Sequence, residues 1–356
     1  MDLAIRIAAI ALAFGLTVFV HELGHFLAAR LAGMAVYEFS IGFGRPLLFW
    51  FRRGDTQYSF RLWPFLSYVR IAGMEPDDDH PQGFGKKRRA AQAAVLSLGS
   101  VMNCLLAVGI FVFMGTVIGM PVYQNYVDKV IAKSPAQQAG LLPGDRIIGV
   151  NGRVKLTVSE IRDAIHSYPG KAMVLEIERG GRRQSIRLVP QVEAGFEIHG
   201  LRIKEIKIGL IGIQFGRKLR PVGVGESVKE GFLFVYGTVQ VQIAGIVGVI
   251  ARTIRPEFMG PVGMADMLYA QAKQGWTDFL WTFAVLTVAV GFLNLLPLPA
   301  LDGSRLVIVG IEAIRGKPFD KRKEAIVHLV GLMAFLCLAV LIAYGDVVRI
   351  LRQKGP

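Results

Sequence analysis

The stretch Ile7–Val20, followed by His21-Glu22-Leu23-Gly24-His25, decides the interpretation of this chain. Its first part is almost entirely apolar and belongs to a run over residues 3–31. A helix needs about 20 apolar residues to cross a bilayer, so the run predicts a membrane-spanning helix. In such a helix residues i and i+4 lie on one face, about 6 Å apart along the axis, so that both imidazoles can bind one Zn²⁺.

Glu22 lies directly beside the first histidine of this H-E-x-x-H pattern. A carboxylate there can take a proton from an attacking water and deliver it to the leaving amine. The alternative is a pair of structural core histidines, which would not explain Glu22. Ionisable residues at membrane depth are rare and usually functional, which favours the metal site.

A catalytic zinc site needs a third protein ligand and one open position. Cys104 and Cys337 lie in apolar runs without a partner at ligand spacing. Asp302 stands out because it closes an apolar run in which Pro297 and Pro299 are expected to break the helix. A helix-capping role would also fit Asp302, but it would leave the two histidines without a third ligand.

Composition agrees with a membrane protein that carries a soluble insert. Of the 356 residues, 53% are hydrophobic and only 19% are charged, against about 25% in globular chains, and the mean hydropathy is +0.45. These values exclude a disordered chain, a coiled coil and an ordinary cytosolic enzyme. Two cysteines exclude a disulfide framework. The net charge of +14 is interpreted as basic residues facing anionic lipid, with no nucleic acid as partner.

Charge placement predicts the topology. Four apolar runs, at residues 3–31, 91–118, 279–301 and 325–345, are expected to span the membrane. Basic clusters before the second run and between the third and fourth should both be cytoplasmic. A fifth run, 232–251, holds two glutamines and three glycines and would place those clusters on opposite sides if it crossed. It is therefore expected to be an interfacial or half-buried helix.

The insert between the second and third spans has the pattern of a compact α+β domain. Short β-type runs between Val127 and Phe215 alternate with glycine-rich turns, and Val158–Ile165 is predicted to be helical. The expected division is 1–32, first span; 33–90, cytoplasmic loop with a membrane-associated β element at about 56–73; 91–118, second span; 119–220, extracytoplasmic domain; 221–276, interfacial helices; 277–303, third span; 304–324, cytoplasmic loop; 325–347, fourth span.

Several motifs in order resemble the site-2 protease family of intramembrane zinc metalloproteases, in particular the bacterial RseP/RasP type. The resemblance covers nearly the whole chain and rests on His21-Glu22-Leu-Gly-His25-Phe, Phe39-Ser-Ile-Gly42-Phe-Gly44, Gly99-x-x-x-Asn103, Gly260-Pro-Val-Gly263 and Asn294-Leu-Leu-Pro297-Leu-Pro299-Ala-Leu-Asp302-Gly303. The insert, through residues 134–152, resembles a single PDZ domain. The implied fold is a polytopic α-helical membrane protein with four transmembrane helices, a membrane-associated β element and an inserted α+β PDZ domain.

The resemblance implies roles for individual residues. His21, His25 and Asp302 would be the zinc ligands and Glu22 the catalytic base. The substrate site would be shaped by Asn103, Asn294, Pro297 and Pro299. Pro64-Phe-Leu66-Ser67-Tyr-Val departs from the Gly-Gly usual in that motif, which bears on the shape of the β element that is thought to present the substrate as a strand.

The implied function is regulated intramembrane proteolysis. The expected substrate is a single-span membrane protein, such as an anti-sigma factor or a remnant signal peptide. The expected location is the bacterial cytoplasmic (inner) membrane as a multi-pass protein, with the PDZ domain on the extracytoplasmic side, where it either binds a peptide ligand or only gates access. The competing classes are a proteolytically inactive membrane PDZ scaffold and a metal transporter, and neither explains all four candidate site residues.

Overall fold

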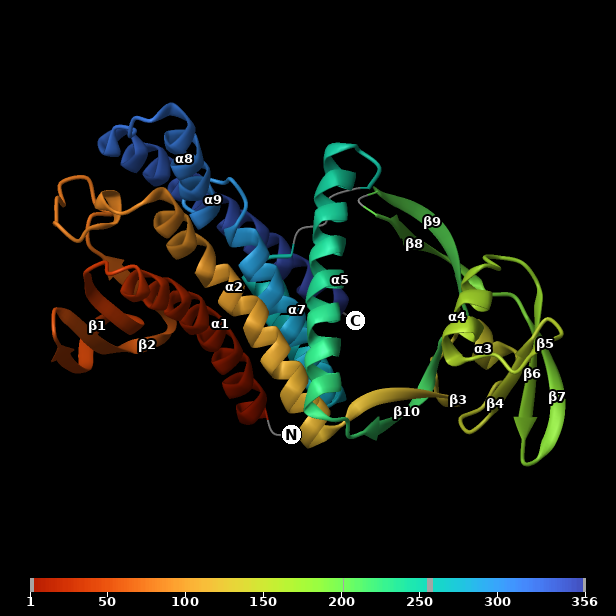
Figure 1. Cartoon of the computed structure of the whole chain (residues 1–356). Coiled ribbons are helices and arrows are strands. Elements are labelled where there is room, and N and C mark those ends of the chain that lie inside the picture. The colour runs from red at the N-terminus through yellow and green to blue at the C-terminus, as the bar shows by residue number, and fades with distance from the viewer. Residues whose placement is uncertain (1–2, 201, 255–258, 355–356) are drawn as a thin grey trace. The chain divides into compact units, whose positions relative to one another are not determined.

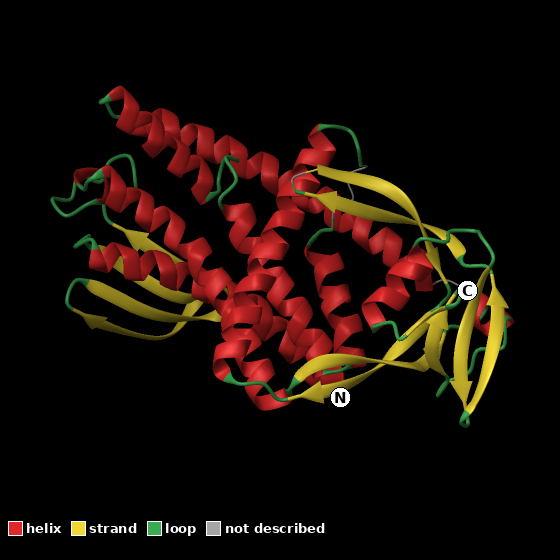
Figure 2. Cartoon of the chain, turned by 45° about the vertical axis from the view of Figure 1, so that its right-hand side comes forward, coloured by secondary structure: helices red, strands yellow, loops and turns green. Residues whose placement is uncertain are grey.

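The computed structural model describes residues 3–200, 202–254 and 259–354 (Figure 1). The chain divides into two compact units. One unit is mainly helical and comprises residues 1–112, 227–239 and 257–356, and the other is rich in strands and comprises residues 113–226 and 240–256. Figure 2, coloured by secondary structure, shows that the helical unit also carries a strand hairpin and that the strand-rich unit also contains short helices.

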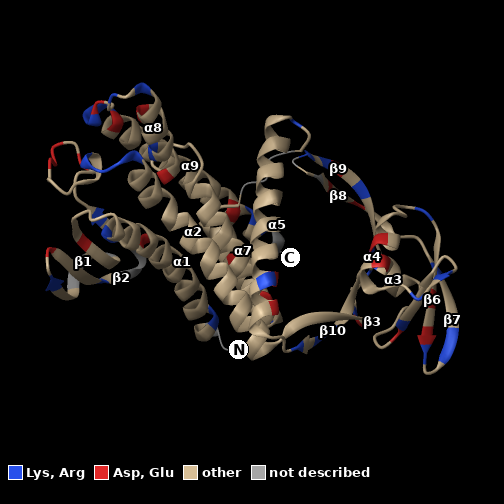
Figure 3. Cartoon of the chain, in the orientation of Figure 1, with Lys and Arg blue, Asp and Glu red and all other residues tan. Residues whose placement is uncertain are grey.

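Long apolar helices build the helical unit. They are α1 (Leu3–Leu31), α2 (Arg89–Phe113), α7 (Trp276–Asn294) and α9 (Lys321–Lys354). Two shorter helices, α6 (Pro261–Gln274) and α8 (Asp302–Arg315), precede and follow α7, and part of α5 (Val224–Ile250) also belongs to this unit. Figure 3, in which charged residues are coloured on the ribbon, shows them around α8 and in the loop that leads into α2, whereas residues 90–118 include none.

The number of helices that could cross a membrane exceeds the expected four. Among the described residues, five helices are long and apolar enough, and the fifth is α5 over Val224–Ile250. The expectation of an interfacial helix at 232–251 rested on the two basic clusters, which a fifth span would place on opposite sides of the membrane. The structure shows a helix of 27 residues there, long and apolar enough to cross. The four-span count and the topology built on it therefore stay predictions.

The third apolar run does not stay helical over its expected length of 279–301. α7 ends at Asn294, and residues 295–301 form turns before α8 begins at Asp302. Proline lacks an amide hydrogen and disfavours a helical conformation in the residue before it, so Pro297 and Pro299 end the helix here. The predicted break before Asp302 is confirmed, but α8 itself was not anticipated.

A long antiparallel hairpin follows α1 in the helical unit (Figure 1). Strand β1 (Val36–Arg53) pairs with β2 (Thr56–Ile71), with irregular register along most of its length. Gly54, in the connecting turn, has φ +61°, which a glycine adopts without strain. The hairpin contains the β element expected at about 56–73 and adds a second strand to it.

The strand-rich unit contains a six-stranded sheet. Its strands are β3 (Met120–Val130), β4 (Arg146–Val150), β5 (Arg153–Val154), β6 (Met173–Arg179), β7 (Arg182–Leu188) and β10 (Ile213–Arg220), in the order β10-β3-β4-β6-β7 with β5 beside β4. A separate hairpin joins β8 (Gln191–His199) and β9 (Arg202–Leu210), and α3 (Pro135–Gln138) is short.

One helix packs into the apolar core of this strand-rich domain. α4 (Val158–His166) buries Ile161 and Ile165 among the strand residues. A capping box between Thr157 and Glu160 satisfies backbone amides at its first turn. The expected α+β architecture and the helix at Val158–Ile165 are confirmed, whereas the PDZ identity of this domain stays a prediction.

Candidate metal centre

Helix α1 presents two histidines on one face, one helical turn apart. His21 and His25 are each only 6% exposed, so both imidazoles lie inside the protein. Their ring centroids are 4.7 Å apart and the ring planes are inclined by 82°. The i, i+4 spacing thus brings the two Nε2 atoms to within 3.1 Å of each other.

Asp302, the first residue of α8, reaches both imidazoles. Its Oδ2 lies 3.0 Å from His21 Nε2 and 3.1 Å from His25 Nε2. The break at the end of α7 makes this approach possible, because α8 starts in a new direction with its first side chain beside α1. The structure therefore brings together all three residues expected to be ligands, and their ligand atoms lie within 4.8 Å of one another.

The donor set and its spacing fit Zn²⁺. Tetrahedral zinc with bonds of about 2.0–2.1 Å holds its ligand atoms about 3.4 Å apart, a few tenths of an ångström more than the distances found here. His25 Nδ1 lies 2.7 Å from the Val95 carbonyl oxygen, which only accepts, so Nδ1 carries the proton and donates. The lone pair of the neutral ring is then on Nε2, the atom that faces His21 and Asp302, as a metal ligand requires.

Glu22 is held by the β hairpin. Its Oε2 accepts a hydrogen bond of 3.0 Å from the backbone amide of Val69 in β2. Val69 lies opposite Phe39 in the register of the hairpin, so the strand that carries this amide is fixed by its neighbour. The hairpin thereby orients the carboxylate that follows the first candidate ligand in sequence.

Glycines allow α1 and α2 to meet at backbone distance beside this centre. A Cβ atom at Gly99 would lie 2.5 Å from His25 Nε2 and 2.9 Å from His21 Cε1. A Cβ atom at Gly24 would lie 2.4 Å from the Leu98 carbonyl oxygen. Any side chain at either position would displace the imidazoles or separate the helices, which gives Gly99 of the second-span motif a physical role.

The residues expected to shape a substrate site lie in two different environments. Asn294 ends α7 half-buried, and Pro297 and Pro299 are exposed in the following turns. Asn103 is fully buried, and a Cβ at Gly291 of α7 would lie 3.0 Å from its Cβ. Neither polar atom of Asn103 has a partner among the described residues. The structure therefore gathers the first three around the turn before α8 and places Asn103 between α2 and α7, away from any open surface.

A buried polar cluster in the hairpin went unnoticed in the sequence. Glu38, 9% exposed, accepts hydrogen bonds from Ser59 Oγ and, at 2.8 Å, from Arg61 Nη2. Burial works to raise the pKa of Glu38, but the bonds from Ser59 and Arg61 outweigh it and leave the pKa below its usual value. Arg61 also donates to Ser40 Oγ and to the Gly44 carbonyl. The available signal was that Glu38 is the one acidic residue within the two strand sequences, 36–53 and 56–71, among several arginines.

Comparison with known proteins agrees with this geometry. The sequence model of peptidase family M50 matches residues 9–338. The chain is 28% identical over 414 residues to zinc metalloprotease RasP of Geobacillus kaustophilus, covering 94% of this chain and 96% of that protein. It is 29% identical over 427 residues to RasP of Oceanobacillus iheyensis, covering 97% and 99%.

A third relative is closer in sequence. The chain is 32% identical over 352 residues to a putative zinc metalloprotease of Rhizobium meliloti, covering 93% of each chain. The family match spans the helix with His21 and His25, the strand-rich insert and the turn with Asp302. The chain therefore belongs to peptidase family M50, the site-2 protease family that its motifs resemble.

Proposed function

We propose that this protein is an intramembrane zinc metalloprotease that hydrolyses a peptide bond in or near the transmembrane segment of a single-span membrane protein. The observation that carries the proposal is the convergence of His21, His25 and Asp302 beside Glu22, on a helix of span length. The names of the relatives support Zn²⁺ as the cofactor. A non-catalytic scaffold would need none of these four side chains.

The chain's own residues divide the chemistry between them. Zinc in such a site supplies Lewis-acid activation of water and of the scissile carbonyl. His21, His25 and Asp302 hold the ion. Glu22, oriented by the Val69 amide, takes a proton from the attacking water and gives it to the leaving nitrogen.

The hairpin supports a proposal for how substrate is held. A peptide bond within a helix is covered by its neighbours, so cleavage requires the helix to unwind. An unwound segment must satisfy its backbone groups, and a strand added to β1–β2 would do so beside Glu22. Asn294 and the prolines after it line the turn that leads to Asp302 and would contact the same segment.

Location and substrates follow from the same reasoning. We place the protein in the bacterial cytoplasmic membrane, with the strand-rich domain on the extracytoplasmic side, where it either binds a peptide or gates access. Anti-sigma factors and remnant signal peptides are the substrate classes that fit a protease of this kind. If α5 crosses the bilayer, the basic cluster before α2 and the one between α7 and α9 lie on opposite sides of the membrane. If it does not, both lie on the cytoplasmic side.

The test is cleavage of a single-span model substrate by the purified full-length protein in detergent. Glu22→Gln should bind zinc normally and lose cleavage by at least about a thousandfold, because general acid–base catalysis contributes 10²–10⁴-fold and both of its steps depend on this group. A zinc chelator should stop the wild type, and added zinc should restore it. Glu226→Gln, which changes an exposed carboxylate paired with Arg220, is the matched control and should cleave normally. Normal cleavage by Glu22→Gln would refute the assignment of the base.

A further inference from the structure

Helix α9 contains one histidine in its apolar stretch, and the proposed chemistry does not use it. Residues 325–345 carry no Asp, Glu, Lys or Arg, and His328 is their single histidine. An ionisable residue inside a membrane-spanning segment is costly and is expected to have a function. His328 is half-buried and lines the same cavity as Asp302, which has a volume of about 330 Å³.

His328 binds the backbone of the turn that carries Asp302. Its Nδ1 accepts a hydrogen bond of 3.2 Å from the Ala300 amide. Because a backbone amide only donates, Nδ1 is unprotonated in this arrangement. Ala300 precedes Asp302 by two residues and has φ +74°, a left-handed conformation that a non-glycine residue rarely adopts. Such strain persists only where the surroundings hold the backbone in place.

A second contact joins the same helix to the same turn. Gly331 lies one helical turn after His328, and a Cβ atom there would lie 2.0 Å from Pro299 Cβ. α9 therefore packs against the turn at backbone distance, three residues before Asp302. The close approach at Gly331 sets the distance between α9 and the turn, and His328 fixes the orientation of the amide.

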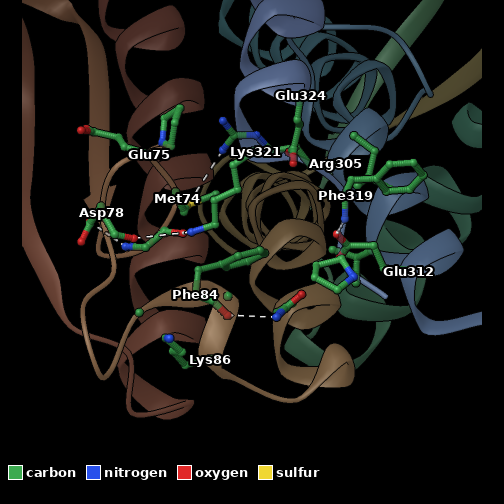
Figure 4. A pocket seen from close by; sticks show the side chains of 18 of the residues that line it. Met74, Glu75, Asp78, Phe84, Lys86, Arg305, Glu312, Phe319, Lys321 and Glu324 are labelled. Carbon is green, nitrogen blue, oxygen red and sulfur yellow. Dashed lines mark hydrogen bonds between the residues drawn. The ribbon is translucent and has the colours of Figure 1, made fainter. Parts of the chain in front are cut away.

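The turn has backbone hydrogen bonds of its own, from the Leu298 amide to the Leu296 carbonyl at 2.7 Å and from the Leu301 amide to the Leu298 carbonyl at 3.1 Å. Leu301, the N-cap residue of α8, provides no side-chain hydrogen bond to the described first turn of that helix. Cavities flank the turn and α8. One is the 330 Å³ cavity, lined by Ala300, Asp302 and His328, and a second of about 340 Å³ shares Arg305 and His328 with it (Figure 4). Among the described residues, the backbone bonds within the turn do not involve the Ala300 amide, which is held instead by His328 on α9.

We propose that His328 is a positioning residue, which holds the Ala300 amide so that the Asp302 carboxylate meets the imidazoles of His21 and His25. This inference rests on the proposed zinc site and adds to it a helix that contributes no ligand. Residues that orient metal ligands in this indirect way typically change metal affinity by 10–100-fold when they are replaced.

The test compares zinc affinity in full-length variants, measured by competition with a chelating dye. His328→Leu replaces the imidazole by an apolar side chain of similar size and removes the Nδ1 acceptor. This variant should bind zinc about tenfold more weakly than the wild type. His328→Asn places its side-chain oxygen where Nδ1 was, and should return the affinity to within about threefold of wild type. If His328 only filled space, His328→Leu would instead bind zinc more tightly than His328→Asn. Cys337→Ala, an exposed position on the same helix, is the control and should bind zinc normally.

Two further variants separate the failure of this inference from the failure of the proposed function. Gly331→Ala pushes α9 from Pro299 without touching His328, and should also weaken zinc binding, which tests the turn even if His328→Leu does not fold. Asp302→Asn should weaken zinc binding more than Gly331→Ala or His328→Leu does. Wild-type affinity in His328→Leu, or no rescue by His328→Asn, overturns the positioning role. Wild-type affinity in Asp302→Asn overturns the zinc site itself.

Discussion

Two aspartates, one in each unit of the molecule, are held in opposite ways. Asp145, in the strand-rich domain, is 1% exposed and meets Arg179, whose Nε and Nη2 lie 2.6 and 2.7 Å from its two oxygens. The Leu142 amide donates to it as well, at 2.8 Å. Asp302, in the helical unit, has two imidazole nitrogens 3.0 and 3.1 Å from one oxygen.

The difference separates a structural carboxylate from a ligand. The Asp145 pair is complete, since a bidentate guanidinium neutralises the charge and occupies both oxygens. Around Asp302, by contrast, three atoms that can each offer a lone pair face one another. A zinc ion placed between them would be bound by all three atoms, as we propose, whereas the Asp145 pair is already complete. The kind of group that contacts a carboxylate, and not how deeply the carboxylate is buried, therefore indicates which aspartate is the candidate ligand.

Exchanging carboxylate for amide at each position should give the largest contrast. Asp302→Asn is expected to weaken zinc binding by at least about a hundredfold and to abolish cleavage, because the amide oxygen is neutral and a much weaker ligand for zinc. Asp145→Asn should bind zinc as the wild type does. Metal content after dialysis against a graded chelator measures both. Equal zinc content in the two variants would contradict the proposal that Asp302 is a zinc ligand and Asp145 is not.

Stability should respond in the reverse order. Asp145→Asn leaves the Arg179 guanidinium without its anion and should destabilise the strand-rich domain by about 2 kcal/mol, the typical range for hydrogen bonds to charged groups. Hydrogen exchange of the β4 and β6 amides in the intact protein measures this loss. Glu178→Gln, in the same sheet but at a more exposed ion pair, should change exchange by much less. Unchanged protection in Asp145→Asn would show that the pair contributes little.

The pH dependence of that domain follows from the same pair. Burial works to raise the pKa of Asp145, but Arg179 and the Leu142 amide outweigh it, so the folded pKa is below the unfolded value of 3.8. A lowered folded pKa means that the contribution is fully present above the unfolded pKa. It is lost as pH falls from about 4 toward the folded pKa. Protection of these amides, expressed relative to the intrinsic exchange rate at each pH, should fall below about pH 4, and Asp145→Asn should show a smaller fall.

The smallest effect is expected in the hairpin, where a complete ion pair supports the catalytic residue. Glu38→Gln weakens the bond to Arg61, and the strand residues near Val69 then hold Glu22 less firmly. Cleavage should fall several-fold, in line with one charged hydrogen bond worth about 1 kcal/mol at this distance from the chemistry. Zinc content should not change. A loss as large as that of Glu22→Gln would mean that Glu38 takes part in the reaction itself.

Sequence patterns predicted those features that depend on local spacing. The i, i+4 histidines, the span-length runs and the helix break at Pro297 all follow from periodicity and backbone chemistry. Asp302 could be singled out because one polar residue closed an apolar run. The Val69 amide and the Val95 carbonyl could not be predicted, because any residue carries those backbone groups. A helix at 232–251 was expected, but the distribution of basic residues alone could not decide whether it lies at the interface or crosses the membrane.

The close contact between α1 and α2 restricts how a long transmembrane substrate can enter. With Gly24 against the Leu98 carbonyl and Gly99 against the imidazoles, no space remains between these two helices for another chain. A lateral route must therefore open elsewhere around the helical unit. A chemical crosslink between α1 and α2 should therefore leave the rate of proteolysis unchanged. Crosslinks between other pairs of helices that stop proteolysis would identify where the substrate enters.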